Sequence, residues 1–303
     1  MKHFLSIESS CREEIEGLVE SAAELKAARV AGELTMRPLE GQCWGMMFSK
    51  SSTRTRVSFE VGIGELGGTA MFLSSRDLQL GRGEPIRDTA RVLGRMIHGA
   101  VIRNDSQTDI EEFAEYSGIP TINALTEMEH PCQIVADLLT MRERIGGWEE
   151  RKVVFVGDGD CNVARSWVWA AKHLGFPLVI ASPAGFCPPD DYLAAVDAPN
   201  ISCSNDPVEA ASGAHVLYTD VWVSMGMEDE AASREQAFKG YQVDERLLDV
   251  AQTDAIVMHC LPAYRGKEIS ADVLEKHAET IFSEAENRLH AQKAIMVSIT
   301  KGQ

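Results

Sequence analysis

The sequence has no paired cysteines. Its seven cysteines stand singly, and no two of them form a Cys-x-x-Cys motif. They are Cys11, Cys43, Cys132, Cys161, Cys187, Cys203 and Cys260. An odd number of isolated thiols argues against a disulfide framework and against a zinc site. We therefore expect a reducing compartment and no bound metal.

Long apolar segments are also missing. No run of 18 apolar residues occurs in the chain, and the opening Met-Lys-His-Phe-Leu is followed at once by Ser-Ile-Glu-Ser-Ser. A membrane-spanning helix needs about 20 mainly apolar residues, and a signal peptide needs an apolar core. We therefore expect a cytoplasmic protein with no membrane partner.

Positive charge is scarce. The chain has 29 lysines and arginines against 46 aspartates and glutamates, a formal net charge of −17. A surface of this sign repels polyanions, which argues against nucleic acid as a partner. A small anion can still bind where arginines gather, because exposed charges more than about 10 Å apart are largely screened at 0.1 M salt.

The length and the order of the predicted elements indicate two α/β domains. A chain of 303 residues with 45% hydrophobic content exceeds the usual size of one domain. Apolar segments that we predict as strands lie at 44–48, 70–73, 100–102, 120–123, 153–156, 178–181, 215–219 and 255–259. Predicted helices lie at 13–31, 57–66, 85–96, 109–117, 132–144, 163–173 and 287–297. This alternation predicts two doubly wound parallel-sheet domains with the active site in the cleft between them.

Residues 48–56 read Phe-Ser-Lys-Ser-Ser-Thr-Arg-Thr-Arg and separate the first strand from a helix. Hydroxyls and guanidinium groups at a helix start gather backbone N–H groups, the positive end of the helix dipole and bidentate donors. This combination favours binding of a phosphate group. The alternative is a Ser/Thr-capped helix with solvated arginines.

Polar segments follow five other predicted strands. Ligands bind outside the carboxyl ends of the strands in open parallel sheets, so we expect these segments to converge with residues 48–56. They contain Arg103-Asn104, His130-Pro131-Cys132-Gln133, the stretch from Gly157 to Asn162, Asp220, and His259-Cys260-Leu261-Pro262.

One further pattern points to another class of protein. Residues 62–67 match the Gly-x-Gly-x-x-Gly fingerprint of dinucleotide-binding proteins. The fingerprint requires these glycines between a strand and the start of a helix, whereas here they fall at the end of a predicted helix. We therefore interpret Gly67-Gly68 as a helix C-cap and keep a nicotinamide-dependent dehydrogenase only as an alternative.

Four motifs, in order along the chain, resemble signatures of the aspartate/ornithine carbamoyltransferase superfamily. They are Ser52-Thr53-Arg54-Thr55-Arg56, His130-Pro131-Cys132-Gln133, Asp220 with Ser224-Met225-Gly226, and His259-Cys260-Leu261-Pro262. The second is similar to the ornithine branch, because the aspartate branch has threonine in place of the cysteine. The likeness covers essentially the whole chain.

The resemblance implies a domain organisation and a reaction. Residues 1–145 would bind carbamoyl phosphate, with a C-terminal helix of about 287–303 packing back on them, and residues 146–286 would bind ornithine. The carbamoyl group would pass to the side-chain amine of L-ornithine, giving L-citrulline and phosphate in arginine metabolism. The resemblance also implies a homotrimer with shared active sites and no cofactor.

The resemblance assigns residues to each substrate. Carbamoyl phosphate would be bound by Ser52, Thr53, Arg54, Thr55, Gln79, Arg103, His130, Gln133, Cys260, Leu261 and Arg288. Ornithine would be bound by Asn162, Asp220, Ser224 and Met225. Arg54, Arg103, His130, Cys260 and Arg288 would be catalytic. Gln79 would act in the site of a neighbouring subunit.

Several alternatives stay open at this point. Cys260 could be a small buried hydrophobic residue, His130 a turn residue, and Asp220 the cap of the next helix. The acceptor could be a modified ornithine, putrescine or aspartate. A non-catalytic relative would be expected to lose its arginines, and these are present.

Overall fold

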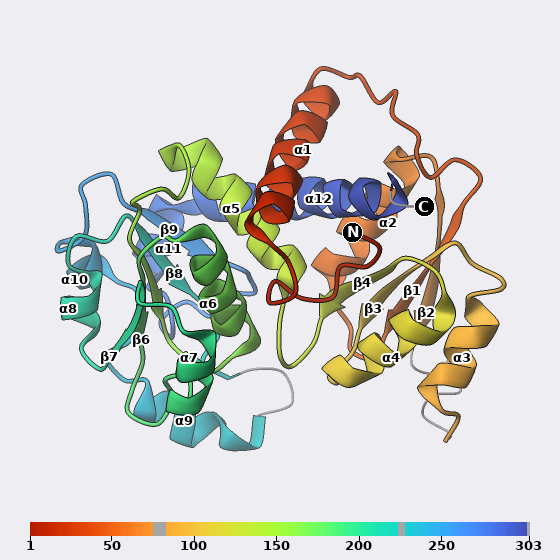
Figure 1. Cartoon of the computed structure of the whole chain (residues 1–303). Coiled ribbons are helices and arrows are strands. Elements are labelled where there is room, and N and C mark those ends of the chain that lie inside the picture. Colours follow the sequence, from red (N-terminus) through yellow and green to blue (C-terminus); the bar gives the residue numbers. More distant parts are fainter. Residues whose placement is uncertain (75–82, 224–227, 302–303) are drawn as a thin grey trace. The chain divides into compact units, whose positions relative to one another are not determined.

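The computed structural model describes residues 1–74, 83–223 and 228–301 (Figure 1). Unit 1 comprises Met1–Leu139 and Glu286–Gln303, and unit 2 comprises Thr140–Ala285. Each unit has one parallel sheet with helices on both faces, so the predicted α/β class is confirmed. The predicted site residues Gln79, Ser224 and Met225 lie outside the described residues.

Unit 1 contains a sheet of four parallel strands. Their order is β2 (Thr69–Ser74), β1 (Cys43–Phe48), β3 (Gly99–Arg103), β4 (Thr121–Leu125). The strand order reverses between β1 and β3, so the chain leaves the carboxyl ends of these two strands in opposite directions. A ligand site is expected at this switch point.

The helices of unit 1 cover both faces of its sheet (Figure 1). They are α1 (Arg12–Val30), α2 (Thr53–Glu65), α3 (Ile86–Leu93), α4 (Gln107–Ser117), the first part of α5 (Pro131–Ile145) and the last part of α12 (Ala278–Lys301). Helices α3 and α4 share a core with Met47 and Ile102 of the sheet. Gly62 allows α2 to lie close to α12, because a Cβ atom there would be 3.2 Å from Cγ of Lys293.

Unit 2 contains a sheet of five parallel strands. Their order is β7 (Ile201–Ser204), β6 (Leu178–Ala181), β5 (Val153–Val156), β8 (Val216–Thr219), β9 (Ile256–His259). Side chains alternate between the two faces, as a strand requires. Val154 and Val156 enter one core, whereas Phe155 stacks on Tyr218 on the other face, where Trp167 also packs. The switch point lies between β5 and β8.

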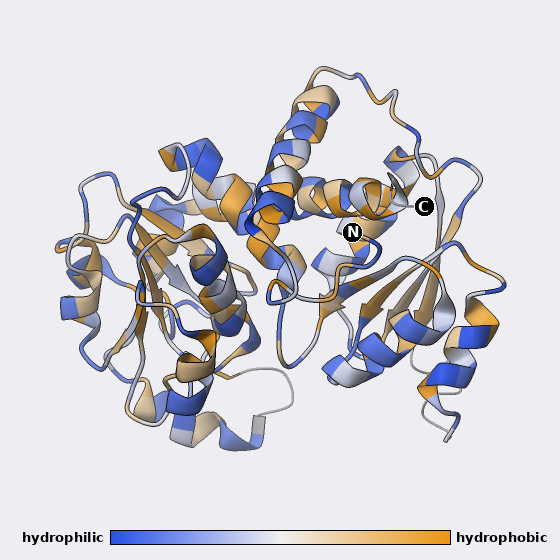
Figure 2. Ribbon diagram, in the orientation of Figure 1, coloured by the Kyte–Doolittle hydropathy of each residue, from blue (hydrophilic) through white to orange (hydrophobic). Residues whose placement is uncertain are grey.

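One longer helix and several short ones complete unit 2. They are α6 (Asn162–Leu174), α7 (Asp190–Val196), α8 (Pro207–Ala211), α9 (Ala231–Ala237), α10 (Glu245–Leu248) and α11 (Ala271–Lys276), with a 3₁₀ turn at Glu228–Glu230. The strands of both sheets are mainly hydrophobic, whereas the helices carry polar residues on their outer sides (Figure 2). No helix in the described ranges is both long enough and apolar enough to span a bilayer.

Two predicted helix starts need correction. The helix predicted at 57–66 begins at Thr53, because Ser52 caps it and its hydroxyl accepts a hydrogen bond from the Thr55 N–H at 3.4 Å. The helix predicted at 287–297 runs from Ala278 to Lys301. The glycine-rich fingerprint lies on the last turns of α2 and the residues after it, and Gly67 has a φ of 90°. The interpretation of this segment as a helix end is therefore confirmed.

Candidate active site

The serine- and threonine-rich segment of unit 1 starts α2 directly after β1. The Ser52 hydroxyl donates a hydrogen bond of 3.0 Å to Oγ1 of Thr55, which is buried. Thr53 and Arg54 are exposed on the first turn of the helix. The first backbone N–H groups of a helix have no partner within the helix, so this turn offers donors and positive charge to an anion.

Two buried arginines lie in the same unit. Arg103 ends β3, and its carbonyl oxygen accepts hydrogen bonds from N (2.9 Å) and Oγ (3.1 Å) of Ser49, which follows β1. Arg288 of α12 donates to Oε1 of Gln133 at 2.7 Å and to Oγ1 of Thr55 at 3.3 Å. Arg288 therefore joins α12 to the starts of α5 and α2.

His130 is buried immediately before α5. Burial lowers its pKa well below 6.5, and the charges of Arg288 and Arg103 lower it further. The ring is therefore neutral at pH 7 and carries one N–H donor. The carboxylate of the preceding residue, Glu129, accepts hydrogen bonds from the N–H groups of Ile7 (2.8 Å) and Glu8 (3.2 Å), which attach the N-terminal segment to this turn.

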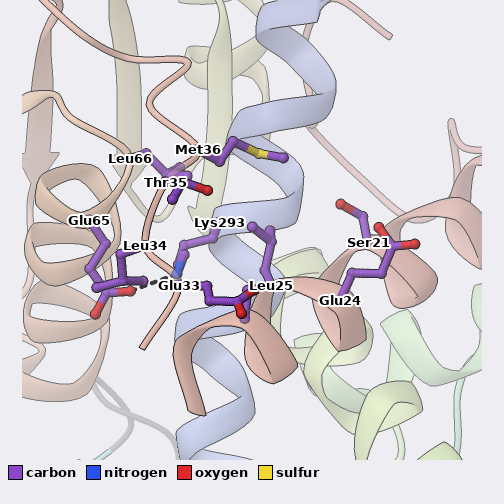
Figure 3. Close-up of a pocket in the computed structure, with 11 residues that line it drawn as sticks. Ser21, Glu24, Leu25, Glu33, Leu34, Thr35, Met36, Glu65, Leu66 and Lys293 are labelled. Carbon is purple, nitrogen blue, oxygen red and sulfur yellow. Dashed lines mark hydrogen bonds and ion pairs between the residues drawn. The ribbon is translucent and has the colours of Figure 1, made fainter. Parts of the chain in front are cut away.

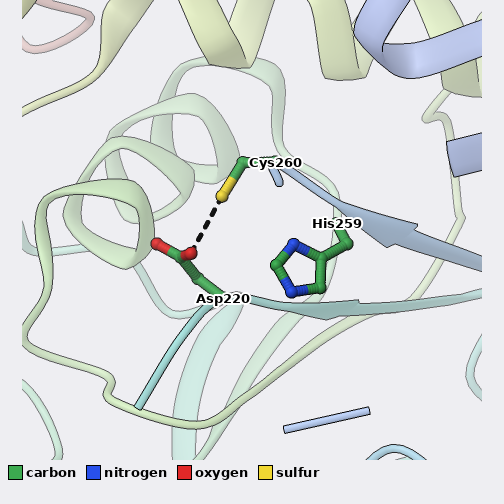
Figure 4. A group of neighbouring side chains, drawn as sticks. All are labelled: Asp220, His259 and Cys260. Atoms are coloured by element: carbon green, nitrogen blue, oxygen red, sulfur yellow. Dashed lines mark hydrogen bonds between the residues drawn. The ribbon is translucent and has the colours of Figure 1, made fainter. Parts of the chain in front are cut away.

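Asp220 and Cys260 follow the neighbouring strands β8 and β9 of unit 2. The thiol of Cys260 donates to Oδ1 of Asp220 at 2.9 Å (Figure 4). The same oxygen accepts a hydrogen bond from the N–H of Val221 at 2.7 Å. Cys260 is partly exposed, so it is not a buried hydrophobic residue, and no helix begins directly after Asp220 within the described residues.

His259 supports this arrangement from within the unit. Its Nδ1 accepts a hydrogen bond from the N–H of Leu261 at 2.9 Å, so Nε2 carries the proton and donates it to Oε1 of Glu268 at 3.1 Å. The His259 N–H donates to Oε2 of Glu284 at 2.9 Å. Leu261 has a left-handed φ of 57°, and the peptide bond that follows it is cis.

Asp220, His259 and Cys260 also place possible metal-ligand atoms within 4.8 Å of one another. A metal would need a nitrogen of His259, and both ring nitrogens already hold the backbone and Glu268 in place. The cluster is therefore better suited to orienting the Cys260 segment than to binding a metal.

The segment after β5 leads to Asn162, the first residue of α6. Cys161 caps this helix, and burial together with the charges of Asp220 and Asp158 raises its pKa well above 9.0. Asp160 pairs with Arg165, whose Nη2 lies 2.7 Å from the carboxylate. Asp160 and Cys161 thus have structural partners within the unit, and Asn162 is the polar side chain at the start of α6.

A cavity of about 210 Å³ lies elsewhere in unit 1 (Figure 3). It is lined by α1, residues 33–36, the end of α2 and Lys293. None of the residues predicted to bind substrate lines it. Its charged wall is an ion pair of 2.6 Å between Lys293 and Glu65.

The structure thus brings together most of the predicted site within each unit. In unit 1, Arg288 donates hydrogen bonds to both Thr55 and Gln133, and the charges of Arg288 and Arg103 help to lower the pKa of His130. Sequence reasoning missed the buried partners Glu268 and Glu284 of unit 2. They are single acidic residues outside any motif, so no sequence signal could have found them.

Models of one protein family match nearly the whole chain. The carbamoyl-P binding domain of aspartate/ornithine carbamoyltransferase matches residues 2–143, and the Asp/Orn binding domain matches residues 149–299. The chain belongs to the aspartate/ornithine carbamoyltransferase family. The resemblance inferred from the four motifs is therefore confirmed.

Individual relatives point to the ornithine branch. The chain is 58% identical to an ornithine carbamoyltransferase of Akkermansia muciniphila over 99% of this chain and 98% of the relative. It is 48% identical to that of Halorhodospira halophila over 100% of both. The solved structure of anabolic ornithine carbamoyltransferase from Campylobacter jejuni has a TM-score of 0.92 at 42% identity and covers 100% of both chains.

Proposed function

We propose that this protein is an ornithine carbamoyltransferase. It transfers the carbamoyl group of carbamoyl phosphate to the side-chain amine of L-ornithine, giving L-citrulline and phosphate. The observation that carries the assignment is the contact between Cys260 and Asp220 at two neighbouring strand ends, in a chain 58% identical to an ornithine carbamoyltransferase. We assign carbamoyl phosphate to residues 1–145 with the end of α12, and ornithine to residues 146–286.

The start of α2 suits the phosphate of carbamoyl phosphate. Ser52, Thr53 and Thr55 offer hydroxyl and backbone donors, and Arg54 offers an exposed guanidinium group beside them. Arg103 adds a second positive charge. Together they stabilise the leaving phosphate as its charge grows.

Donors for the carbonyl oxygen come from buried side chains. As the amine attacks, this oxygen becomes negative, and Thr55, Arg103 and His130 donate to it. A neutral His130 suits this task, because it donates without having to titrate. Gln133 and Arg288, hydrogen-bonded to each other, bind the remaining part of the carbamoyl group. One such donor contributes about 3–4 kcal/mol where it has been measured.

The attacking amine must be uncharged, although a free alkyl amine has a pKa of about 10.4. Cys260 and the backbone at Leu261 orient its lone pair, and Asp220 pairs with the α-ammonium group of ornithine. Asn162, with Ser224 and Met225, binds the α-carboxylate. The ammonium form loses one proton to solvent before attack, and the second proton, released from the nitrogen as the C–N bond forms, goes to the departing phosphate.

The decisive experiment is a panel of acceptors at fixed carbamoyl phosphate, with the ureido product measured by colour. Ornithine should react, whereas putrescine, aspartate and N-acylated ornithine should not. Arg54→Ala should abolish turnover without unfolding, and Arg37→Ala, which removes an exposed arginine of the same unit, should not. Folded protein that makes no citrulline would refute the function.

We also propose a cytoplasmic homotrimer with shared active sites. All seven cysteines are free thiols, in keeping with a reducing compartment. Val57 (52% exposed) and Val61 (38%), one turn apart on α2, leave an apolar strip that a second copy could cover. Light scattering should give three times 33.2 kDa. Val61→Glu should lower this mass, whereas Val92→Glu on α3 should not.

A further inference from the structure

Unit 2 buries an arginine that has no part in the proposed chemistry. Arg234 lies on α9 and is 8% exposed. Its Nη1 donates to Oδ2 of Asp158 at 2.6 Å and to the carbonyl oxygen of Trp222 at 3.1 Å. Its Nε donates to Oε2 of Glu230 at 3.0 Å. One guanidinium group therefore holds three separate acceptors.

Two of these acceptors belong to the segments assigned to ornithine. Asp158 is the second residue after β5 and stands four residues before Asn162. Trp222 stands two residues after Asp220, which follows β8. Strands β5 and β8 are neighbours on either side of the switch point of the sheet. Arg234 thus ties together the two strand ends that carry Asn162 and Asp220.

Both segments are also held against the rest of the unit. Oδ1 of Asp158 accepts a hydrogen bond from the N–H of Asp160 at 3.2 Å, which shapes the turn leading to Asn162. The Trp222 ring stacks on Phe238 at 5.8 Å. The guanidinium carbon of Arg234 lies 5.3 Å from the ring centre of Phe186. The arginine therefore has a single well-defined position between the two segments.

A buried ion pair is weak evidence for a stabilising role, because apolar residues of similar volume often serve stability equally well. The directions of its hydrogen bonds explain the presence of Arg234 better than stability does. The planar guanidinium group reaches three acceptors in fixed directions, which a single lysine nitrogen cannot reproduce.

We propose that Arg234 is a positioning residue for the amino-acid substrate. Through Asp158 and the Trp222 carbonyl group it sets the spacing between Asn162 and Asp220, and hence the fit of the α-carboxylate and α-ammonium groups of ornithine. This inference rests on the proposed function.

The test compares Arg234→Lys, Asp158→Asn and the double variant Arg234→Met/Asp158→Asn with the wild type. The double variant leaves no unpaired charge of this pair buried, so it guards against simple unfolding. Arg246→Met, which removes an arginine that is 47% exposed in the same unit, is the matched control. Circular dichroism and thermal melting establish that each variant is folded.

The readouts separate positioning from general damage. KM for ornithine should rise about 10–100-fold in all three variants, the range found when the groups that orient metal ligands are removed. KM for carbamoyl phosphate should stay within about twofold, because Asp158 and Trp222 belong to the segments of Asn162 and Asp220, which are assigned to ornithine. The inhibition constant of L-norvaline, which has the α-groups of ornithine without the side-chain amine, should rise in parallel. The control should match the wild type.

Three results would overturn the inference. The first is an unchanged KM for ornithine and norvaline affinity in the folded double variant. The second is wild-type behaviour of Arg234→Lys. The third is an equal loss for both substrates, which would indicate a merely structural role. If the wild type makes no citrulline, the proposed function fails, and the role of Arg234 is then tested by calorimetric binding of ornithine. An unchanged ornithine affinity in the double variant would refute the positioning role.

Discussion

A buried lysine in unit 1 allows a quantitative prediction about stability. The side chain of Lys293 is 2% exposed, and its Nζ lies 2.6 Å from Oε2 of Glu65 (Figure 3). The other carboxylate oxygen of Glu65 lies 2.8 Å from Nε of Arg29. The Glu65 side chain is 13% exposed and that of Arg29 is 41% exposed. The two cations of this group therefore differ greatly in their access to water.

This difference predicts an asymmetric response to substitution. Glu65→Gln leaves the Lys293 charge buried without a carboxylate, which should cost about 3–5 kcal/mol of the free energy of unfolding. Lys293→Met leaves Glu65 paired with Arg29 and close to water, so the cost should be about 1–2 kcal/mol. The double variant buries no member of the pair in charged form and should lie within about 1 kcal/mol of the wild type.

Hydrogen exchange followed by mass spectrometry on peptides of α2 and α12 measures the free energy of local unfolding in each variant. The measurement does not require both units to unfold together. Burial acts to raise the pKa of Glu65, but hydrogen bonds from Lys293 and Arg29 prevail and hold it below 4.5. The stability from a lowered carboxylate pKa is present above the unfolded value and is lost as the pH falls through the folded one. The advantage of the wild type over Glu65→Gln should therefore shrink below about pH 4.5. Equal costs for the two single variants would refute the reasoning.

Three further predictions concern the active site and the sheet. His130→Asn should lower kcat about 100-fold, because it alters a donor to the carbonyl oxygen. The kcat of the wild type should not change near pH 6.5, because the lowered pKa of His130 keeps its ring neutral there. A change in kcat near pH 6.5 that is present in the wild type and lost in the variant would contradict the neutral state of His130. Cys260→Ala should lower kcat/KM for ornithine about 10–100-fold, since it removes a hydrogen bond to the Asp220 carboxylate. In Cys260→Ser, kcat/KM should stay within a few fold of the wild type, because the hydroxyl can still donate. Equal losses in the two variants would exclude the hydrogen bond as the cause. Gly99→Ala would place a Cβ atom 2.5 Å from the Trp44 ring and should cost about 1–3 kcal/mol in urea unfolding; unchanged stability would show that the ring can move aside.

The strands of both sheets could largely be predicted because buried parallel strands are short continuous apolar runs. Strand β7 could not, because its middle residues Ser202 and Cys203 are exposed at the sheet edge and give no apolar run. The helices from α7 to α11 have four to seven residues, too few for helical periodicity to appear. Tertiary packing, not local pattern, determines these elements.

The candidate site also contains residues that the sequence indicates and residues that only the folded structure reveals. Arg103 ends β3 and Asp220 directly follows β8, so both lie at strand ends as expected from the sequence, where a parallel sheet binds its ligands. The residues that support them could not be predicted. Glu284 reaches the backbone of His259 from α12, and Arg234 reaches Asp158 from α9, over separations of 25 and 76 residues. Such pairs become visible only when the chain is folded.

The discontinuity of unit 1 affects the order of folding during synthesis. Its first segment ends at Leu139, and the segment that completes it begins at Glu286. Unit 2 is continuous from Thr140 to Ala285 and is fully synthesised before that second segment leaves the ribosome. The nascent first segment therefore waits, without Arg288 and Lys293, for almost the entire chain to be translated.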